Sequence, residues 1–205
     1  MAEEHTQAKD DPAVARKRPK PGERRIQILQ ALAAMLEQPG SERVTTAALA
    51  AKLGVSEAAL YRHFASKAQM FEGLIEFIEN SVFSLLNQIA QEPLDAPDKL
   101  RRMLTVLLQF AERNPGMARV MVGDALVFEN DRLHQRMSLF FDKVEANFRQ
   151  VVRDVPGTTP TPTVDAQALA SVAMAFTIGR LHRFARSGYK RSTLEHLDAS
   201  LRWLL

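Results

Sequence analysis

The chain has 205 residues, of which 46% are hydrophobic, and it carries a net charge of +3. This is an ordinary globular composition that can bury a core in one or two small domains. The chain has no cysteine, which excludes disulfides, thiolate metal ligands and cysteine nucleophiles. We expect a cytoplasmic protein, because the N-terminus lacks an apolar signal core and no segment approaches the roughly 18–20 apolar residues of a membrane span.

Residues 1–21 are rich in charge and proline and poor in apolar side chains, which predicts a disordered segment. They include a basic run, Arg16–Lys20. Such a run can serve as a solubilising tail or as an arm that contacts nucleic-acid phosphates. Its position directly ahead of the helices described next favours the arm.

From Glu23 onward, apolar residues recur at steps of three and four, which predicts helices, and no segment alternates as a strand would. Capping residues, proline and glycine mark the ends of these helices. The sequence therefore predicts an all-α protein with two folded units, residues 22–65 and 66–205, after the arm of residues 1–21. The expected helices run from Glu23 to Pro39-Gly40, from Thr45 to Gly54, from Ser56, from Ser66 through Ile89, and over Asp98–Arg113, Met117–Gly123, Asp131–Val152, Val164–Arg186 and Thr193–Leu204.

Two short helices around Gly54 have the pattern of a helix-turn-helix. Gly54 suits a turn that needs a positive φ, and Ala50 is small enough for a close helix crossing. Side chains left on the outer face can contact phosphates through hydroxyl groups and charge, or thymine methyls through small side chains. A helical hairpin without a ligand is the alternative. The expected DNA-contacting residues are Thr45, Thr46, Ser56, Ala58, Ala59, Tyr61, Arg62 and Lys67.

These positions resemble the signature of the TetR-type regulators. The resemblance implies an N-terminal three-helix DNA-binding domain with the helix-turn-helix, followed by a C-terminal helical dimerisation domain. It also implies a homodimer that binds palindromic double-stranded DNA, with one recognition helix for each half-site. The matching residues are Thr45, Leu49-Ala50, Leu53–Ser56, Leu60–Phe64 and Lys67.

A narrower resemblance links the chain to the nucleoid occlusion factors of this family. The matching segments are Val55–Phe64, Leu74–Glu79, Glu112–Gly116 and Phe128–Leu133. The resemblance implies a nucleoid-associated protein that binds DNA and the C-terminal tail of the division protein FtsZ, and so blocks division over the chromosome.

By matching position, Phe77, Arg113 and Asn114 would line the FtsZ-tail groove, between the long helix after the helix-turn-helix and the next one. A groove with one cation and an apolar surface would suit an acidic, partly apolar peptide. Core packing is the alternative for Phe77, and a solvated helix cap is the alternative for Arg113. The sequence departs from the pattern at Leu85, Gln109 and Ala111.

A ligand-responsive transcriptional repressor is the second hypothesis, in which a small effector fills the C-terminal unit. Its cavity would be lined by Met and Phe side chains, although such residues at helical spacing are more often core. Gly179 would allow close approach of helices at a dimer interface. The effector-cavity candidates are Phe110, Met117, Met121, Phe140, Phe141 and Phe148.

The sequence contains no catalytic constellation, phosphate-binding glycine loop or histidine spacing suited to a metal. We therefore expect no enzymatic activity, no metal and no cofactor.

Overall fold

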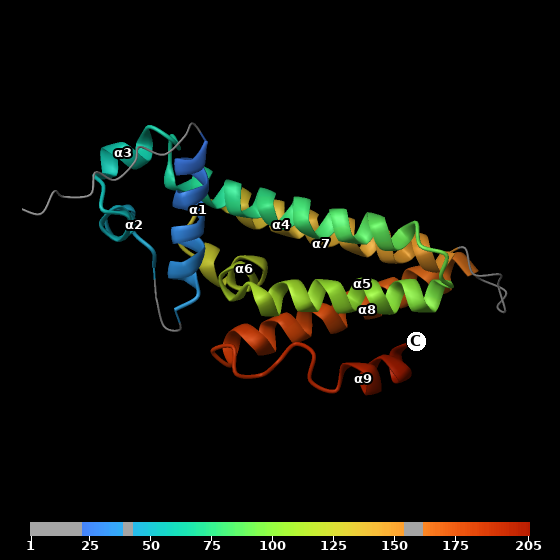
Figure 1. The fold of residues 1–205 in the computed structure, drawn as a ribbon. Helices are drawn as coiled ribbons and strands as arrows, with labels where there is room; N and C mark the ends of the chain where they lie inside the picture. Colours follow the sequence, from blue (N-terminus) through green and yellow to red (C-terminus); the bar gives the residue numbers. More distant parts are fainter. Residues whose placement is uncertain (1–21, 39–42, 154–161) are drawn as a thin grey trace, which may run out of the picture.

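The computed structural model describes residues 22–38, 43–153 and 162–205, and these are helical without any strand (Figure 1). The predicted all-α fold is confirmed. The basic run Arg16–Lys20, Pro39-Gly40 and the loop at 156–161 lie outside the described residues. The elements are α1 (Glu23–Leu36), α2 (Thr46–Leu53), α3 (Glu57–Tyr61), α4 (Lys67–Ala90), α5 (Ala96–Arg113), α6 (Pro115–Met121), the 3-10 helix η1 (Asp124–Leu126), α7 (Asp131–Arg153), α8 (Pro162–Arg186) and α9 (Leu197–Leu204).

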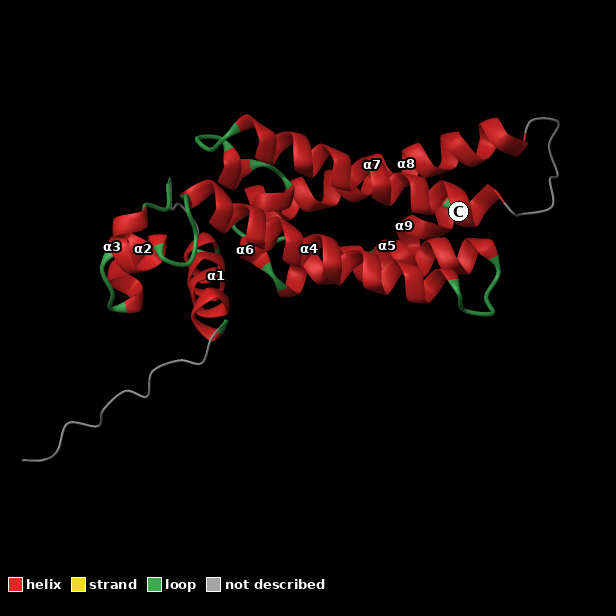
Figure 2. Ribbon diagram, turned by 90° about the horizontal axis from the view of Figure 1, so that it is seen from above, coloured by secondary structure: helices red, strands yellow, loops and turns green. Residues whose placement is uncertain are grey.

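Helices α1, α2 and α3 gather at one end of the molecule, and the longer helices extend away from them (Figure 1). Helix α4 leads away from this end and α5 returns toward it. Helices α7 and α8 pack side by side along the body (Figure 2). We call α1–α3 the N-terminal unit and α4–α9 the helical body.

One continuous apolar core joins the N-terminal unit to the helical body. Ile28 and Leu32 of α1 are buried, as are Met70, Phe71 and Leu74 near the start of α4. Burial of apolar surface is the main favourable contribution to folding, so this shared core fixes the two parts together.

Helices α2, α3, α4 and α5 each begin after a residue whose side chain caps the helix, and the caps at Ser56 and Ser66 were predicted. The Ser66 hydroxyl accepts a hydrogen bond from the Gln69 amide at 3.2 Å, and the Asp95 carboxylate accepts one from the Asp98 amide at 2.9 Å. Because Asp95 is the cap, α5 begins at Ala96, two residues earlier than predicted.

Other elements also differ from the sequence prediction, among them α8, which begins at Pro162 and not at Val164. Helix α6 begins at Pro115, because proline is well suited to a first helical turn, and the short helix η1 was not predicted. Helix α9 begins at Leu197 and not at Thr193. Thr193 is instead bound to Glu112, and His196 adopts a left-handed conformation with φ of 51°.

Candidate nucleic-acid interface

The turn between α2 and α3 has the geometry that the sequence predicts. Gly54 adopts a left-handed conformation, with φ of 64° and ψ of 39°. The Val55 amide donates to the Ala50 carbonyl at 3.0 Å and closes the turn. Leu49, Ala50 and Leu60 are buried beneath it. The two helices are thus held by a glycine turn and a small apolar contact.

The hydroxyl groups at the starts of both helices are engaged with the backbone. Thr45 Oγ1 accepts from the Ala48 amide at 3.1 Å, and Ser56 Oγ accepts from the Ala59 amide at 3.3 Å. Each is an N-cap in extended conformation. The caps use lone pairs of these oxygens, so the hydroxyl hydrogens can still be donated to phosphate oxygens.

Helix α3 is open to solvent along most of its length. Leu60 is its only buried residue, while Ala58 and Arg62 are exposed and Tyr61 is 45% exposed. The helix lies at the outer edge of the N-terminal unit (Figure 1). It can therefore enter a DNA groove without rearrangement of the core.

A side-chain hydrogen bond ties α2 to α3. Thr46 Oγ1 donates to Glu57 Oε2 at 2.5 Å. Thr46 was expected to contact a phosphate, and this bond gives it a second role in fixing the angle between the helices.

The structure places Lys67 differently from the other expected DNA contacts. Its ammonium forms an ion pair with Glu129 and lies 5.6 Å from the centre of the Phe71 ring. The Lys67 side chain is only 17% exposed. Lys67 is therefore not part of the exposed face of α3, because its ammonium is paired with the nearly buried carboxylate of Glu129.

Sequence reasoning missed Arg25, a cation beside the recognition helix. Its Nη1 donates to the His63 carbonyl at 2.7 Å, and its guanidinium lies 4.1 Å from the centre of the Phe64 ring. Arg25 remains exposed. It joins the first turn of α1 to the end of α3, a contact that local patterning in the sequence does not reveal.

Phe77 marks the candidate partner groove. Its side chain is 49% exposed, and its ring lies 6.2 Å from that of Phe110, which is nearly buried. Phe77 and Asn114 line an open pocket of about 420 Å³. The pocket was expected between two helices of the body, but α1 and its C-cap residue supply much of the lining, through Ile26, Leu29, Gln30, Ala33, Ala34 and Glu37.

The other candidate partner residues lie at the corner between α5 and α6. Arg113 is exposed at the last residue of α5, where a cation is favoured by the helix dipole. Asn114 Nδ2 donates to the Phe110 carbonyl at 2.7 Å and so caps α5. Arg113 does not line the pocket that contains Phe77 and Asn114, so the three residues do not form one cavity.

The positions that depart from the nucleoid occlusion pattern lie in different surroundings. Leu85 is partly exposed on α4, about two turns beyond Phe77, and it does not line the pocket at Phe77. Gln109 lines a separate pocket beneath α9, and Ala111 is buried. Of these three positions, Leu85 is therefore the exposed one on the helix that carries Phe77.

The candidate effector-cavity residues pack closely with the core. Phe140 is fully buried, with its ring centre 5.5 Å from that of Phe83 and 5.1 Å from that of Phe141. Phe148, Met117 and Met121 are buried as well, and Met117 also lines the open pocket at Phe77. The ring contacts fit the core alternative for the phenylalanines, whereas Met117 borders a pocket.

Within residues 22–38, 43–153 and 162–205, no group of His, Asp and Glu side chains could hold a metal ion. No helix in these same ranges is long and apolar enough to cross a membrane.

The fold and the exposed helix-turn-helix define a helical DNA-binding regulator. The chain matches the bacterial regulatory proteins of the tetR family over residues 28–74, and the SlmA-like tetracyclin repressor-like C-terminal domain over residues 95–205. The chain belongs to the TetR family, whose members bind DNA and act as dimers. It is a regulator and not an enzyme.

Among related proteins, the nucleoid occlusion factor SlmA of Idiomarina loihiensis is 49% identical over 86% of this chain and 90% of its own length. SlmA of Photobacterium profundum is 50% identical over 85% of this chain and 90% of its own. SlmA of Colwellia psychrerythraea is 46% identical over 89% of this chain and 92% of its own length. The narrower resemblance to nucleoid occlusion factors is confirmed.

Solved structures of the TetR family share the fold at lower identity. The regulator PfmR from Thermus thermophilus is 20% identical, with a TM-score of 0.65 over 87% of this chain and 97% of its own. FadR from Bacillus subtilis, solved with stearoyl-CoA, is 14% identical, with a TM-score of 0.67 over 87% of this chain and 96% of its own. At this identity, the likeness concerns the fold alone.

Proposed function

We propose that the chain is a nucleoid occlusion factor: a homodimer that binds palindromic chromosomal DNA and, through its helical body, the C-terminal tail of FtsZ, so that division is inhibited over the nucleoid. The observation that best supports this proposal is that about half of the aligned residues are identical to those of SlmA proteins over most of the chain. The exposed α3 supports its DNA-binding part. The DNA-binding domain in this proposal is residues 22–65, and residues 66–205 carry the dimer and partner surfaces.

The DNA-binding part rests on the outer face of the helix-turn-helix. Tyr61 and Arg62 are exposed at the end of α3, and Ala58 and Ala59 leave room for close approach to base edges. Hydroxyls at Thr45, Thr46 and Ser56 lie at helix N-termini, where phosphate is favoured. Arg25 adds a cation to this face.

The partner part rests on Phe77 and its surroundings. A half-exposed phenylalanine beside an open apolar pocket provides a site for an apolar side chain. Arg113 offers a positive charge to an acidic segment of the same peptide. Leu85 is a second exposed apolar side chain on α4, about two turns from Phe77.

The dimer surface in this proposal is the outer face of α8. Val172 is 53% exposed there, and a Cβ built on Gly179 would meet no atom within 4 Å. An open face with small residues permits close approach of a second copy.

A peptide titration tests the partner proposal. A fluorescent peptide of the FtsZ C-terminal tail is titrated with the protein, alone and with a palindromic duplex that the protein selects from a random pool. Arg113→Ala is expected to weaken peptide binding about tenfold and to leave duplex binding unchanged, because a charged contact is lost far from α3. Arg101→Ala, on the same helix, is the matched control and should bind the peptide as the unaltered chain does.

Two results would overturn the partner proposal: no binding of the peptide with or without duplex, or equal binding by the Arg113→Ala variant. Neither result bears on DNA binding, which the duplex titration measures separately.

A further inference from the structure

The C-terminal end of α1 is fastened to the helical body through one carbonyl. The Leu36 carbonyl accepts a hydrogen bond from Tyr189 Oη at 3.1 Å and another from Arg119 Nη1 at 3.2 Å. Carbonyls in the last turn of a helix have no partner within the helix. Here the body supplies two donors, from α6 and from the segment after α8.

Tyr189 is held rigidly in the position from which it makes this contact. Gly188 and Tyr189 both adopt left-handed conformations, with φ of 61° and 66°. For tyrosine this conformation costs on the order of 1 kcal/mol or more, so the surroundings must maintain it. The Tyr189 amide donates to the Phe184 carbonyl at 3.0 Å, and the two rings lie 5.2 Å apart. Burial raises the pKa of Tyr189, and the hydroxyl therefore stays protonated as a donor.

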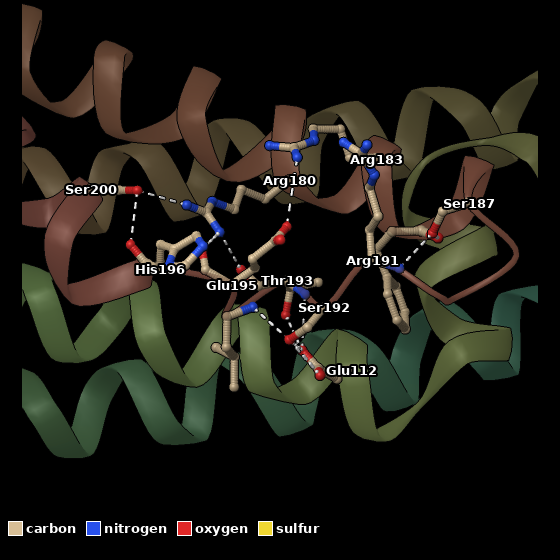
Figure 3. A network of polar contacts seen from close by, with 12 residues as sticks. Glu112, Arg180, Arg183, Ser187, Arg191, Ser192, Thr193, Glu195, His196 and Ser200 are labelled. Atoms are coloured by element: carbon tan, nitrogen blue, oxygen red, sulfur yellow. Dashed lines mark hydrogen bonds and ion pairs between the residues drawn. The ribbon is translucent and has the colours of Figure 1, made fainter.

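The far side of the same segment is anchored to α5 by Glu112 (Figure 3). The Glu112 carboxylate accepts from Ser192 Oγ at 2.8 Å, from the Thr193 amide at 3.0 Å and from Thr193 Oγ1 at 2.6 Å. Thr193 is almost completely buried. A partly buried carboxylate with several donors holds this turn of chain in one place.

Arg180 anchors the segment from α8 (Figure 3). Its guanidinium donates to the Thr193 carbonyl at 3.1 Å, to the Glu195 carbonyl, and to Ser200 Oγ at 2.8 Å. The connection between α8 and α9 is therefore a braced segment, fixed to α5 and α8 at one side and to α1 at the other.

Helix α1 can act as a lever between this segment and the recognition helix. Arg25 near its first turn binds the His63 carbonyl at the end of α3, and Leu36 at its last turn binds Tyr189. The helix has 14 residues and so is about 20 Å long. A change in position at Leu36, small enough for the shared apolar core to accommodate, would tilt α1 and move the N-terminal unit with it.

We propose that the α8–α9 connection, residues 187–196, sets the position of the N-terminal unit on the helical body, with Tyr189 as a positioning residue for DNA binding. A dimer must present its two recognition helices at the separation of the two half-sites, about 34 Å for one helical turn of DNA. The angle of α1 decides that separation. Tyr189 touches no DNA in this proposal, and it acts on which half-site spacing is bound best.

The test is Tyr189→Phe, which removes only the hydroxyl. The probes are the duplex selected from a random pool by the unaltered protein, and copies with the centre shortened by one base pair or lengthened by one or two. The variant is expected to bind the selected duplex about three- to tenfold more weakly, as fits the loss of one hydrogen bond. Because the N-terminal unit is then less constrained, the protein should distinguish less between the selected duplex and the copies with altered spacing. The ratio of these affinities should fall at least about three- to tenfold. The salt dependence should not change, because no phosphate contact is lost.

A second variant and a control complete the design. Glu112→Gln keeps the size of the anchor but loses its charge, and it should flatten the spacing preference in the same direction. Ser138→Ala removes a hydroxyl that donates to the His134 carbonyl at 3.2 Å within α7, and it should leave the preference unchanged. If Tyr189→Phe and Glu112→Gln, folded by circular dichroism, keep the spacing preference of the unaltered protein, the proposal is wrong. A lowered salt slope in Tyr189→Phe would also overturn it, since that result would indicate a phosphate contact.

Discussion

The Lys67 ammonium forms an ion pair with the Glu129 carboxylate, which joins the first residue of α4 to the segment between η1 and α7. The two side chains are only 17% and 8% exposed. The charge of Lys67, the first cation after the helix-turn-helix, is therefore neutralised by a carboxylate of the helical body. Glu129 and DNA phosphates would compete for the same ammonium.

We predict that Glu129→Gln strengthens DNA binding about two- to fivefold. The variant leaves Lys67 without its carboxylate, so its charge is available to a phosphate, and each added phosphate contact steepens the salt slope by about 0.9. Titration of a selected palindromic duplex at several salt concentrations measures both quantities. The melting temperature should fall, because the variant removes one partner of a mostly buried pair.

Glu72→Gln is the matched control, because it makes the same change of net charge. Glu72 pairs with Arg132 at 2.7 Å on a more exposed surface. If both variants strengthen DNA binding equally, net charge alone explains the effect and competition for Lys67 is ruled out.

Thr45 combines two roles that substitution can separate. Thr45→Ala removes both the cap of α2 and a hydroxyl that can reach DNA, so it should weaken specific binding and cost about 1 kcal/mol of stability. Thr45→Asp keeps a capping oxygen but adds a negative charge. It should retain the stability and lose DNA binding further, by phosphate repulsion. Urea unfolding and duplex titration distinguish these effects, and equal DNA affinity in all three proteins would contradict a DNA contact at Thr45.

The helix-turn-helix could be predicted from sequence because its determinants are local. Gly54 sets the turn, and Thr45, Ser56 and Ser66 cap helices through amides three residues away. Periodicity likewise located the body helices to within a few residues. The predicted start of α9 was wrong because Thr193 binds Glu112, which is distant in the sequence.

The contacts that assemble the site could not be predicted in this way. Arg25 and His63 are 38 residues apart, Lys67 and Glu129 are 62 apart, and Leu36 and Tyr189 are 153 apart. Each depends on how helices pack, which no pattern in a single segment encodes. The part that α1 plays in the pocket at Phe77 was missed for the same reason.

Glu112 predicts a pH dependence of stability. Burial alone would raise its pKa, but hydrogen bonds from Thr193 and Ser192 outweigh burial and lower the pKa below its ordinary value of 4.5. A carboxyl group whose pKa is lowered by folding stabilises the fold above its unfolded pKa, and this contribution is lost as the pH falls through the folded pKa. The free energy of unfolding should therefore decrease below about pH 4.5, and Glu112→Gln should show a smaller decrease. Parallel pH curves for the two proteins would contradict this.

Gly116 is predicted to be intolerant of any side chain. A Cβ built at this position would lie 2.3 Å from the Ala33 carbonyl oxygen, a backbone atom of α1. Gly116→Ala must push α6 away from α1, and overpacking of this kind costs about 1–3 kcal/mol. Urea unfolding would show a lower midpoint, whereas an unchanged midpoint would mean that the close approach is relieved without cost.

The exposed face of α8 supports a last prediction, for the dimer. Val172→Lys places a charge on the proposed interface, about two helical turns from Gly179, where it would be buried without a partner in the dimer. The variant is expected to sediment as a monomer at micromolar concentration and to bind the palindrome at least about tenfold more weakly, because a single recognition helix reads one half-site. Val127→Lys, on the exposed segment after η1, makes the same change at a similarly exposed valine and should remain a dimer. A dimeric Val172→Lys variant with unaltered affinity would place the interface on another face.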